Sequence, residues 1–463
     1  MLRRVLQLAT TRRRFTTSKH HPCIIPQSLQ TFSYSSTPKT SENSAAHIVE
    51  HLAGNDESHL STSSTISIDR SGLCNPLEHS HENNFDSELV KHLKSIIKVR
   101  GGPISVAEYM EEVLTNPNAG FYINRDVFGA GGNFITSPEV SQMFGELGPG
   151  RGTLMVDLLR GASKFKSFIE SVHIHLIECS PTLKELQHRN LKCEDEDDSS
   201  PTSEKKTISR LAGTSVSWHA AFEQVPSGVP TIIIAHEFYD ALPVHQFQKA
   251  SRGWCEKMVD VAEDSSFHFV LSPTPTPAKL FLAKRCKWAV REVDKLNQIE
   301  ICPKAMELTE SISKGISADG GGALIIDYGL NGLVSDSLQA IRKHKFVDIL
   351  DKPGTADLSA YVVFESIRLS AEEASGDVSV HGPMTQSQFL GSLGINFRVE
   401  TLMQNCTSDE QAELLRAGYW RLVGEGEAPF WEGPEDKAPI GMGTRYLAMA
   451  IVNKNQGIPI PFQ

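Results

Sequence analysis

The feature of this chain that most restricts its fold is a glycine-rich stretch with an acid before it, Glu146-Leu147-Gly148-Pro149-Gly150-Arg151-Gly152. Glycine lets the backbone turn sharply and approach a ligand, because no Cβ stands in the way. The free N–H groups of a helix that begins after such a turn favour anionic groups. The stretch therefore predicts a nucleotide-type cofactor site that contains Glu146, Gly148, Gly150 and Gly152.

The spacing of the three glycines distinguishes between cofactor classes. A dinucleotide-binding fingerprint reads G-x-G-x-x-G, whereas Gly148, Gly150 and Gly152 give G-x-G-x-G. The shorter spacing resembles motif I of Rossmann-like methyltransferases, which bind S-adenosylmethionine. A dinucleotide-dependent oxidoreductase is the rival interpretation, and a plain glycine loop without a ligand is the third.

Length, charge and cysteine use exclude several other classes. The 463 residues are enough for a large core and one to three domains. A net charge of −11 argues against nucleic-acid binding by bulk electrostatics. No apolar run approaches the ~20 residues that cross a bilayer. The eight cysteines are scattered without a C-x-x-C pair, so no metal site is predicted.

The N-terminal region is unlike the rest of the chain. Residues 1–41 contain no Asp or Glu, and their arginines lie among apolar and hydroxylated residues. This composition is typical of a mitochondrial or plastid transit peptide. We expect import into the mitochondrial matrix, because the arginines begin at once. Residues 42–84 are rich in Ser, His, Asn and Glu and predict a disordered linker. A methyltransferase-like domain is expected over residues 85–463.

Short apolar runs alternate with helical patterns beyond the glycine turn. They predict strands over residues 172–177, 216–218, 231–235 and 323–326. Apolar strands separated by helices indicate a parallel sheet that is covered on both faces. Arg398–Met403 and Arg445–Val452 are expected to close it as an antiparallel pair, and an insertion at about 244–277 to add a β-rich subdomain. The expected fold is thus an α/β, Rossmann-like methyltransferase fold.

In a doubly wound sheet, ligands bind at the carboxyl ends of the strands. Glu178 follows the strand at 172–177, where an acid can hold both ribose hydroxyls of an adenosyl group. Trp218 and His219 end the next strand, where an aromatic edge can flank adenine. Ordinary packing is the other explanation for the Trp-His pair.

The strand at 231–235 leads into His236-Glu237-Phe238-Tyr239-Asp240. Two carboxylates three positions apart suit a cationic substrate, because the planar donors of a guanidinium match carboxylates. An attacking nitrogen must also lose a proton, which an acid or a histidine can accept. Acids favoured by a helix dipole are the alternative explanation. We predict Glu237, Asp240 and His236 as catalytic residues, whereas Asp327, at the end of another strand, caps or binds.

Several motifs agree, in order and spacing, with a single family. They are 131–139, 147–152, 236–243, 325–329, 336–340, 353–358 and Thr385-Gln386. Together they resemble the MidA-like mitochondrial complex I assembly factor seven family, which contains a protein arginine methyltransferase. The resemblance implies S-adenosylmethionine as the methyl donor. It also implies symmetric dimethylation of an arginine in a core matrix-arm subunit of complex I as the reaction.

The chain departs from the family pattern in three places. Asn133 and Val363 stand where the family has Asp, so two carboxylates near a cationic substrate or cofactor are expected to be lost. The family also has a helix and a buried strand before the glycine turn, but here fewer than ten residues separate Pro138 from Gly148. The first, central strand is therefore expected to be missing. A catalytically impaired or non-enzymatic complex I assembly factor is the resulting alternative, and the oligomeric state is left open.

Overall fold

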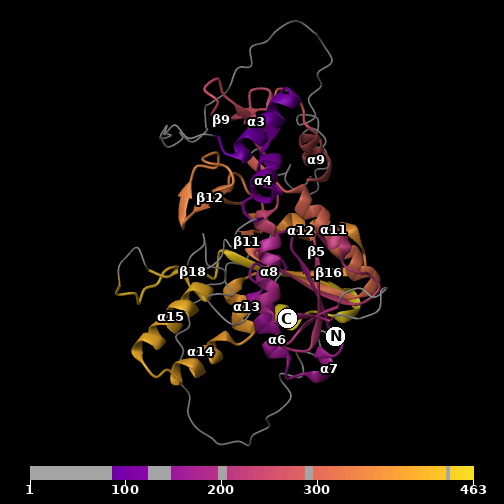
Figure 1. Cartoon of the computed structure of the whole chain (residues 1–463), viewed down its shortest axis with the longest axis vertical. Helices are drawn as coiled ribbons and strands as arrows, with labels where there is room; N and C mark the ends of the chain where they lie inside the picture. The colour runs from indigo at the N-terminus through magenta and orange to yellow at the C-terminus, as the bar shows by residue number, and fades with distance from the viewer. Residues whose placement is uncertain (1–85, 124–146, 197–205, 287–295, 434–437) are drawn as a thin grey trace, which may run out of the picture.

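The computed structural model describes residues 86–123, 147–196, 206–286, 296–433 and 438–463 of the chain. Figure 1 shows an elongated molecule in which α3 (Glu88–Arg100), α4 (Val106–Thr115) and α9 (Pro277–Arg285) lie at one end. The other end contains α6 (Thr153–Ala162), α7 (Lys166–Ile169) and α8 (Pro181–Asn190).

One five-stranded sheet is mixed. Its strands are β6 (Thr231–His236), β11 (Gly321–Leu330), β15 (Val362–Val363), β16 (Val378–Thr385) and β19 (Tyr446–Asn453). β6 and β15 pair with β11 in parallel, whereas β19 lies antiparallel between β11 and β16. Apolar side chains cover both faces, because Ile325 packs with α11 (Pro303–Asp319) and α12 (Phe364–Ala374) while Ile326 packs with α13 (Gln386–Ser392). The predictions of buried strands at 231–235 and 323–326 are confirmed.

A second sheet carries the strand that precedes Glu178. Its order is β2-β5-β4-β3, with β2 at His173–Ile177, β5 at Thr214–His219, β4 at Lys206–Ser209 and β3 at Cys193–Glu196. β2 and β5 are parallel. Ile174, Leu176 and Val216 pack against Leu159 of α6, which gives this sheet a core of its own.

Among the described strands, two parallel strands each have one unpaired edge. A central strand would be expected to pair with both edges. Among the described strands, β2 pairs only with β5 and β6 pairs only with β11. The parallel strands therefore form two separate sheets within the described residues. Ile232, an apolar residue on β6, is 47% exposed. Residues 124–146, where the central strand was expected to be missing, lie outside the described residues.

The predicted insertion forms antiparallel strands. They are β7 (His245–Ala250), β8 (Gly253–Val261) and β9 (Phe267–Leu271), and they pair with β1 (Ile104–Ser105) and β10 (Gln298–Ile301) from outside the insertion. α4 begins beside this sheet with a capping box, in which Ser105 and Glu108 exchange hydrogen bonds. Two smaller sheets are β13-β12-β14 (Lys345–Val347, Gln339–Arg342, Asp357–Ser359) and β17-β18 (Glu425–Glu427, Ile440–Met442).

The predicted late strand pair is half wrong. Arg445–Val452 corresponds to β19, but Arg398–Met403 lies inside α14 (Ile395–Gln404), which packs against α15 (Asp409–Val423). Gly394 precedes α14 in the left-handed conformation, at φ 85°, and so lets the chain turn into the helix. Leu402 of the run is 42% exposed, so the run lacks the burial of a strand in a covered sheet. The partner of β19 on that side is β16.

Candidate active site

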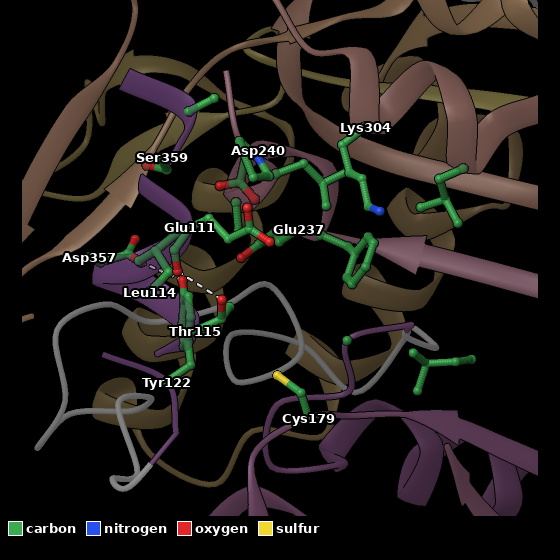
Figure 2. A pocket seen from close by; sticks show the side chains of 18 of the residues that line it. Glu111, Leu114, Thr115, Tyr122, Cys179, Glu237, Asp240, Lys304, Asp357 and Ser359 are labelled. Carbon is green, nitrogen blue, oxygen red and sulfur yellow. Dashed lines mark hydrogen bonds between the residues drawn. The ribbon is translucent and has the colours of Figure 1, made fainter. Parts of the chain in front are cut away.

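A cavity of about 1070 Å³ lies at the carboxyl ends of the parallel strands in the mixed sheet and in the β2-β5-β4-β3 sheet. On the side of β2 it is lined by Gly148, Gly150 and Glu178. On the side of β6 it is lined by Glu237 and Asp240. Figure 2 shows Glu237 and Asp240 among the lining side chains, with Asp357 and Tyr122 to one side and Lys304 to the other. One cavity therefore joins the predicted cofactor residues to the predicted substrate residues.

The glycine turn has the backbone that only glycine adopts readily. Gly148, Gly150 and Gly152 have φ of 70°, 47° and 75°. A Cβ at Gly148 would lie 2.6 Å from Cδ2 of Phe238, in the turn after β6. The glycine at this position thus lets the two parts of the site approach each other.

Gln187 connects the predicted cofactor residues and is itself fully buried. Its Nε2 donates to the carbonyl oxygen of Gly150 at 2.8 Å and to Oε2 of Glu178 at 3.1 Å. Its Oε1 accepts a hydrogen bond from Nε1 of Trp218 at 2.9 Å. Gln187 was not predicted, because a glutamine in the middle of an amphipathic helix carries no distinctive signal.

The residues beside β2 fit an adenosyl group. Glu178 is 7% exposed, and burial raises the pKa of its carboxyl group. Its Oε1 accepts from the backbone N–H of Ser180 at 2.8 Å, which fixes the carboxylate at the cavity wall. A carboxylate has about four acceptor positions, so capacity remains for a ribose hydroxyl.

The pair predicted to flank adenine lies away from the cavity, unlike Glu178. Trp218 and His219 are not among the residues that line the cavity. The indole of Trp218 is bonded to Gln187, and Nε2 of His219 lies 2.9 Å from Nδ1 of His175. Phe222, in the 3₁₀ turn after β5, lines the cavity instead. Its position in the loop after a strand end was the available signal.

The turn after β6 is organised by Asp327 of β11, which directly follows Ile326, the last residue that pairs with β6. Its Oδ2 accepts hydrogen bonds from the backbone N–H groups of Phe238 at 3.1 Å, Tyr239 at 3.0 Å and Asp240 at 3.3 Å. Glu237 begins this turn with a φ of 51°, a conformation that is uncommon for residues other than glycine. Asp327 therefore holds the backbone of the turn that carries the two cavity-lining acids.

Burial and mutual repulsion make the carboxylates of this turn hard to ionise. The pKa of Asp240 is held well above its usual range by burial and by the nearby Asp327, Asp357 and Glu237. Burial and Glu237 raise the pKa of Asp327 to about 8. Burial raises the pKa of Asp357 to about 6, although a hydrogen bond from Tyr122 opposes this rise. A cation that enters the cavity offsets both the burial and the mutual repulsion of the ionised carboxylates.

Tyrosines surround the acids. The rings of Tyr328 and Tyr361 meet edge to face at 5.0 Å, and that of Tyr446 lies 5.8 Å from Tyr328. All three line the cavity together with Tyr122. Aromatic faces attract cations within about 6 Å of the ring centroid. Asp357 and these tyrosines were not predicted as site residues, since they come from four separate segments; the family motif at 353–358 was the only signal for Asp357.

Several predicted residues lie away from the cavity or outside the described chain. Glu146 and Asn133 lie outside the described residues. His236 is 1% exposed and does not line the cavity. Val363 is the N-cap residue of α12, where no side chain caps the helix. An Asp at position 363 would therefore cap this helix. Its replacement by Val363 removes a helix cap and not the carboxylate near the substrate that was expected to be lost.

Two further properties concern the described residues alone. None of their helices combines the length and apolar character needed to cross a membrane. No three of their His, Cys, Asp or Glu side chains are grouped so that they hold a metal ion.

The chain is similar to known methyltransferases. Residues 137–384 match the family model described as "Putative S-adenosyl-L-methionine-dependent methyltransferase". Proteins named "Protein arginine methyltransferase NDUFAF7, mitochondrial" match from Mus musculus, with 39% identity over 74% of this chain and 82% of the relative, and from Homo sapiens, with 38% over 72% and 80%. The homolog of Drosophila melanogaster is 37% identical over 81% of this chain and 87% of its own.

A solved structure shows the same fold. It is a COG1565 superfamily member from Burkholderia thailandensis bound to S-adenosyl-homocysteine, with a TM-score of 0.61, 22% identity and coverage of 81% of this chain and 94% of that one. It confirms the predicted Rossmann-like methyltransferase fold.

The matches decide between the cofactor classes. The family description confirms S-adenosylmethionine and excludes the dinucleotide-dependent oxidoreductase. The names of the relatives confirm the mitochondrial prediction. The chain belongs to the family of S-adenosyl-L-methionine-dependent methyltransferases that includes the mitochondrial protein arginine methyltransferases named NDUFAF7.

Proposed function

We propose that this chain methylates an arginine side chain of a protein in the mitochondrial matrix. The observation that carries the proposal is the acidic cavity, in which Glu237, Asp240 and Asp357 lie among four tyrosines. Planar donors of a guanidinium match such carboxylates, and the tyrosine rings favour the same positive charge. Arginine as the substrate is also supported by the relatives, which are named protein arginine methyltransferases.

The proposed roles divide along the cavity. Gly148, Gly150 and Glu178 hold S-adenosylmethionine, which supplies an electrophilic methyl group when bound. Glu237 and Asp240 bind the guanidinium and orient one of its nitrogens toward that methyl group. The positive charge of the guanidinium keeps Asp240 ionised, because it opposes the repulsion from the neighbouring acids. Asp327 maintains the turn and so acts through Asp240.

The finer substrate assignment rests on the family resemblance. We propose a core matrix-arm subunit of complex I as the protein substrate and symmetric dimethylarginine as the product. Recognition of the subunit would stabilise assembly intermediates of complex I. The names of the relatives support a protein substrate and a mitochondrial location.

A specific observation favours a second function. The open edges of β2 and β6 leave the glycine turn without strand support in the described chain. A chain that keeps the substrate surface but binds the cofactor poorly acts as a non-enzymatic assembly factor.

One experiment separates the two functions. The full chain is incubated with S-adenosylmethionine and a peptide that contains one arginine, and the products are identified by mass spectrometry. A matched peptide with lysine in place of the arginine is the control. Methylation of the arginine peptide alone supports the enzyme. Binding of the arginine peptide without methyl transfer supports the assembly factor, and methylation of the lysine peptide contradicts the proposed substrate.

A further inference from the structure

We propose that His245, held by the carboxylate of Glu256, accepts the proton that the substrate guanidinium loses. This inference rests on the proposed function, because it assigns a proton acceptor to that reaction. Nδ1 of His245 lies 2.6 Å from Oε1 of Glu256. The Glu256 side chain is 2% exposed, whereas that of His245 is 22% exposed and lines the cavity.

The position of His245 follows from the chain path. β7 begins at His245, directly after the turn that carries Glu237 and Asp240. Glu256 lies on β8, which runs antiparallel to β7. The histidine is therefore placed between a buried carboxylate and the cavity that contains the two acids.

The carboxylate determines which nitrogen of His245 is available. An ionised carboxylate only accepts hydrogen bonds, so the Nδ1 atom of His245 donates its proton to Glu256. In a neutral imidazole the other nitrogen then has a free lone pair. Nε2 of His245 is thus left as the proton acceptor. When it takes a proton, the buried charge of Glu256 stabilises the imidazolium, as in other carboxylate–histidine pairs.

The reaction requires such an acceptor. A guanidinium is protonated at any physiological pH, so its nitrogens have no free lone pair for attack. We assign the transfer of one Nη–H proton from the guanidinium to Nε2 of His245. The freed nitrogen lone pair forms the new bond to the methyl carbon, and the electron pair of the broken carbon–sulfur bond stays on the sulfur. The two positive charges at the start become a methylguanidinium and a protonated His245.

The carboxylates of the turn are less suited to this task. Glu237 and Asp240 bind the cation through its remaining N–H groups, so their negative charge is needed while the methyl group moves. His245 is a neutral base that becomes positive next to Glu256. It removes the proton while the two carboxylates continue to bind the cation. This division predicts that His245 affects turnover more than substrate binding.

The kinetic test compares three variants of the full chain. His245→Gln removes the acceptor, Glu256→Gln keeps an acceptor for Nδ1 but removes its charge, and Lys249→Gln is a matched exposed control on β7. We expect kcat for the arginine peptide to fall on the order of 10²–10⁴-fold in His245→Gln, with KM little changed. Glu256→Gln should lose less, and Lys249→Gln should match the wild type. In a fourth variant, His245→Ala, free imidazole should restore part of the turnover.

A second measurement does not depend on turnover. Imidazole ¹⁵N NMR of the full chain should show His245 protonated at Nδ1 and unprotonated at Nε2, and added arginine peptide should shift the Nε2 signal more than the Nδ1 signal. A proton on Nε2 in the free protein overturns the inference, as does normal kcat in His245→Gln. If wild type transfers no methyl group to arginine, the proposed function fails, whereas the NMR result still decides on the His245–Glu256 pair.

Discussion

Asp327 holds Asp240 in place: its Oδ2 atom lies 3.3 Å from the backbone nitrogen of Asp240 and accepts its N–H. Asp327 lies on β11 directly after Ile326, which pairs with His236 at the end of β6, and Asp240 lies in the turn that follows β6. One acid thus acts on the backbone and the other lines the cavity. The two carboxylates also repel each other, which contributes to the raised pKa of Asp240.

Replacement of Asp240 by Asn should lower methyl transfer while leaving cofactor affinity unchanged. The substitution removes a carboxylate from the guanidinium side of the cavity but none of the contacts around Glu178. A hydrogen bond to a charged group contributes about 1.5–3 kcal/mol. Loss of that energy corresponds to a loss of kcat/KM on the order of tenfold to a hundredfold. Calorimetry with S-adenosylmethionine and a peptide methylation assay measure the two effects. Weak cofactor binding with normal turnover at saturation would reverse the assigned role.

Replacement of Gly148 by Ala should disrupt the cofactor turn. The new Cβ would lie 2.6 Å from Cδ2 of Phe238, and Gly148 has a φ of 70°. We expect a loss of stability of about 1–3 kcal/mol and a clear loss of cofactor affinity. Gly161→Ala is the matched control, because a Cβ there meets nothing within 4 Å inside α6. That control should stabilise the protein by roughly 1 kcal/mol. Equal melting temperatures for the two variants would contradict the close approach of Phe238.

Replacement of Asp357 by Asn should change the pH dependence of stability. The pKa of Asp357 is raised from 3.8 to about 6 in the folded protein. Its contribution to stability is therefore present below about pH 4 and is lost as the pH rises through 6. The variant should match the wild type near pH 4 and be more stable at pH 7 by on the order of 2–3 kcal/mol.

Chemical denaturation across this pH range measures the difference between Asp357→Asn and the wild type. The amide keeps an oxygen that accepts the hydrogen bond from Tyr122. A variant that is less stable than the wild type at pH 7 would show that the charge of Asp357 is compensated in the folded protein.

Restoring the missing segment before Leu147 should improve both folding and cofactor binding. β2 and β6 have open edges in the described chain, and a ~5-residue strand between them would pair with both. We expect the present chain to melt at a lower temperature than a repaired chain and to bind S-adenosylmethionine weakly or not at all. Thermal melting with and without the cofactor compares the two proteins. A present chain that melts cooperatively and shifts upward with the cofactor, as the repaired chain does, would refute this expectation.

The sequence by itself determined the elements and residues that depend on local patterns. The apolar runs that end in Glu178 and in His236-Glu237 form strands because several apolar side chains in succession require burial. The glycine turn was readable because its three glycines follow a fixed spacing. The prediction of a missing strand came from chain length alone, since fewer than ten residues separate Pro138 from Gly148.

Only the tertiary structure decided which side chains share the cavity. Gln187, Asp357 and Tyr446 come from distant segments, and a pattern within one segment carries no information about such meetings. Arg398–Met403 was misassigned for a related reason, because a short run of apolar and charged residues fits a helix or a strand until its packing partners are known. Likewise, His236 and Asp240 are neighbours in sequence, but the strand end buries His236 and the turn held by Asp327 directs Asp240 into the cavity.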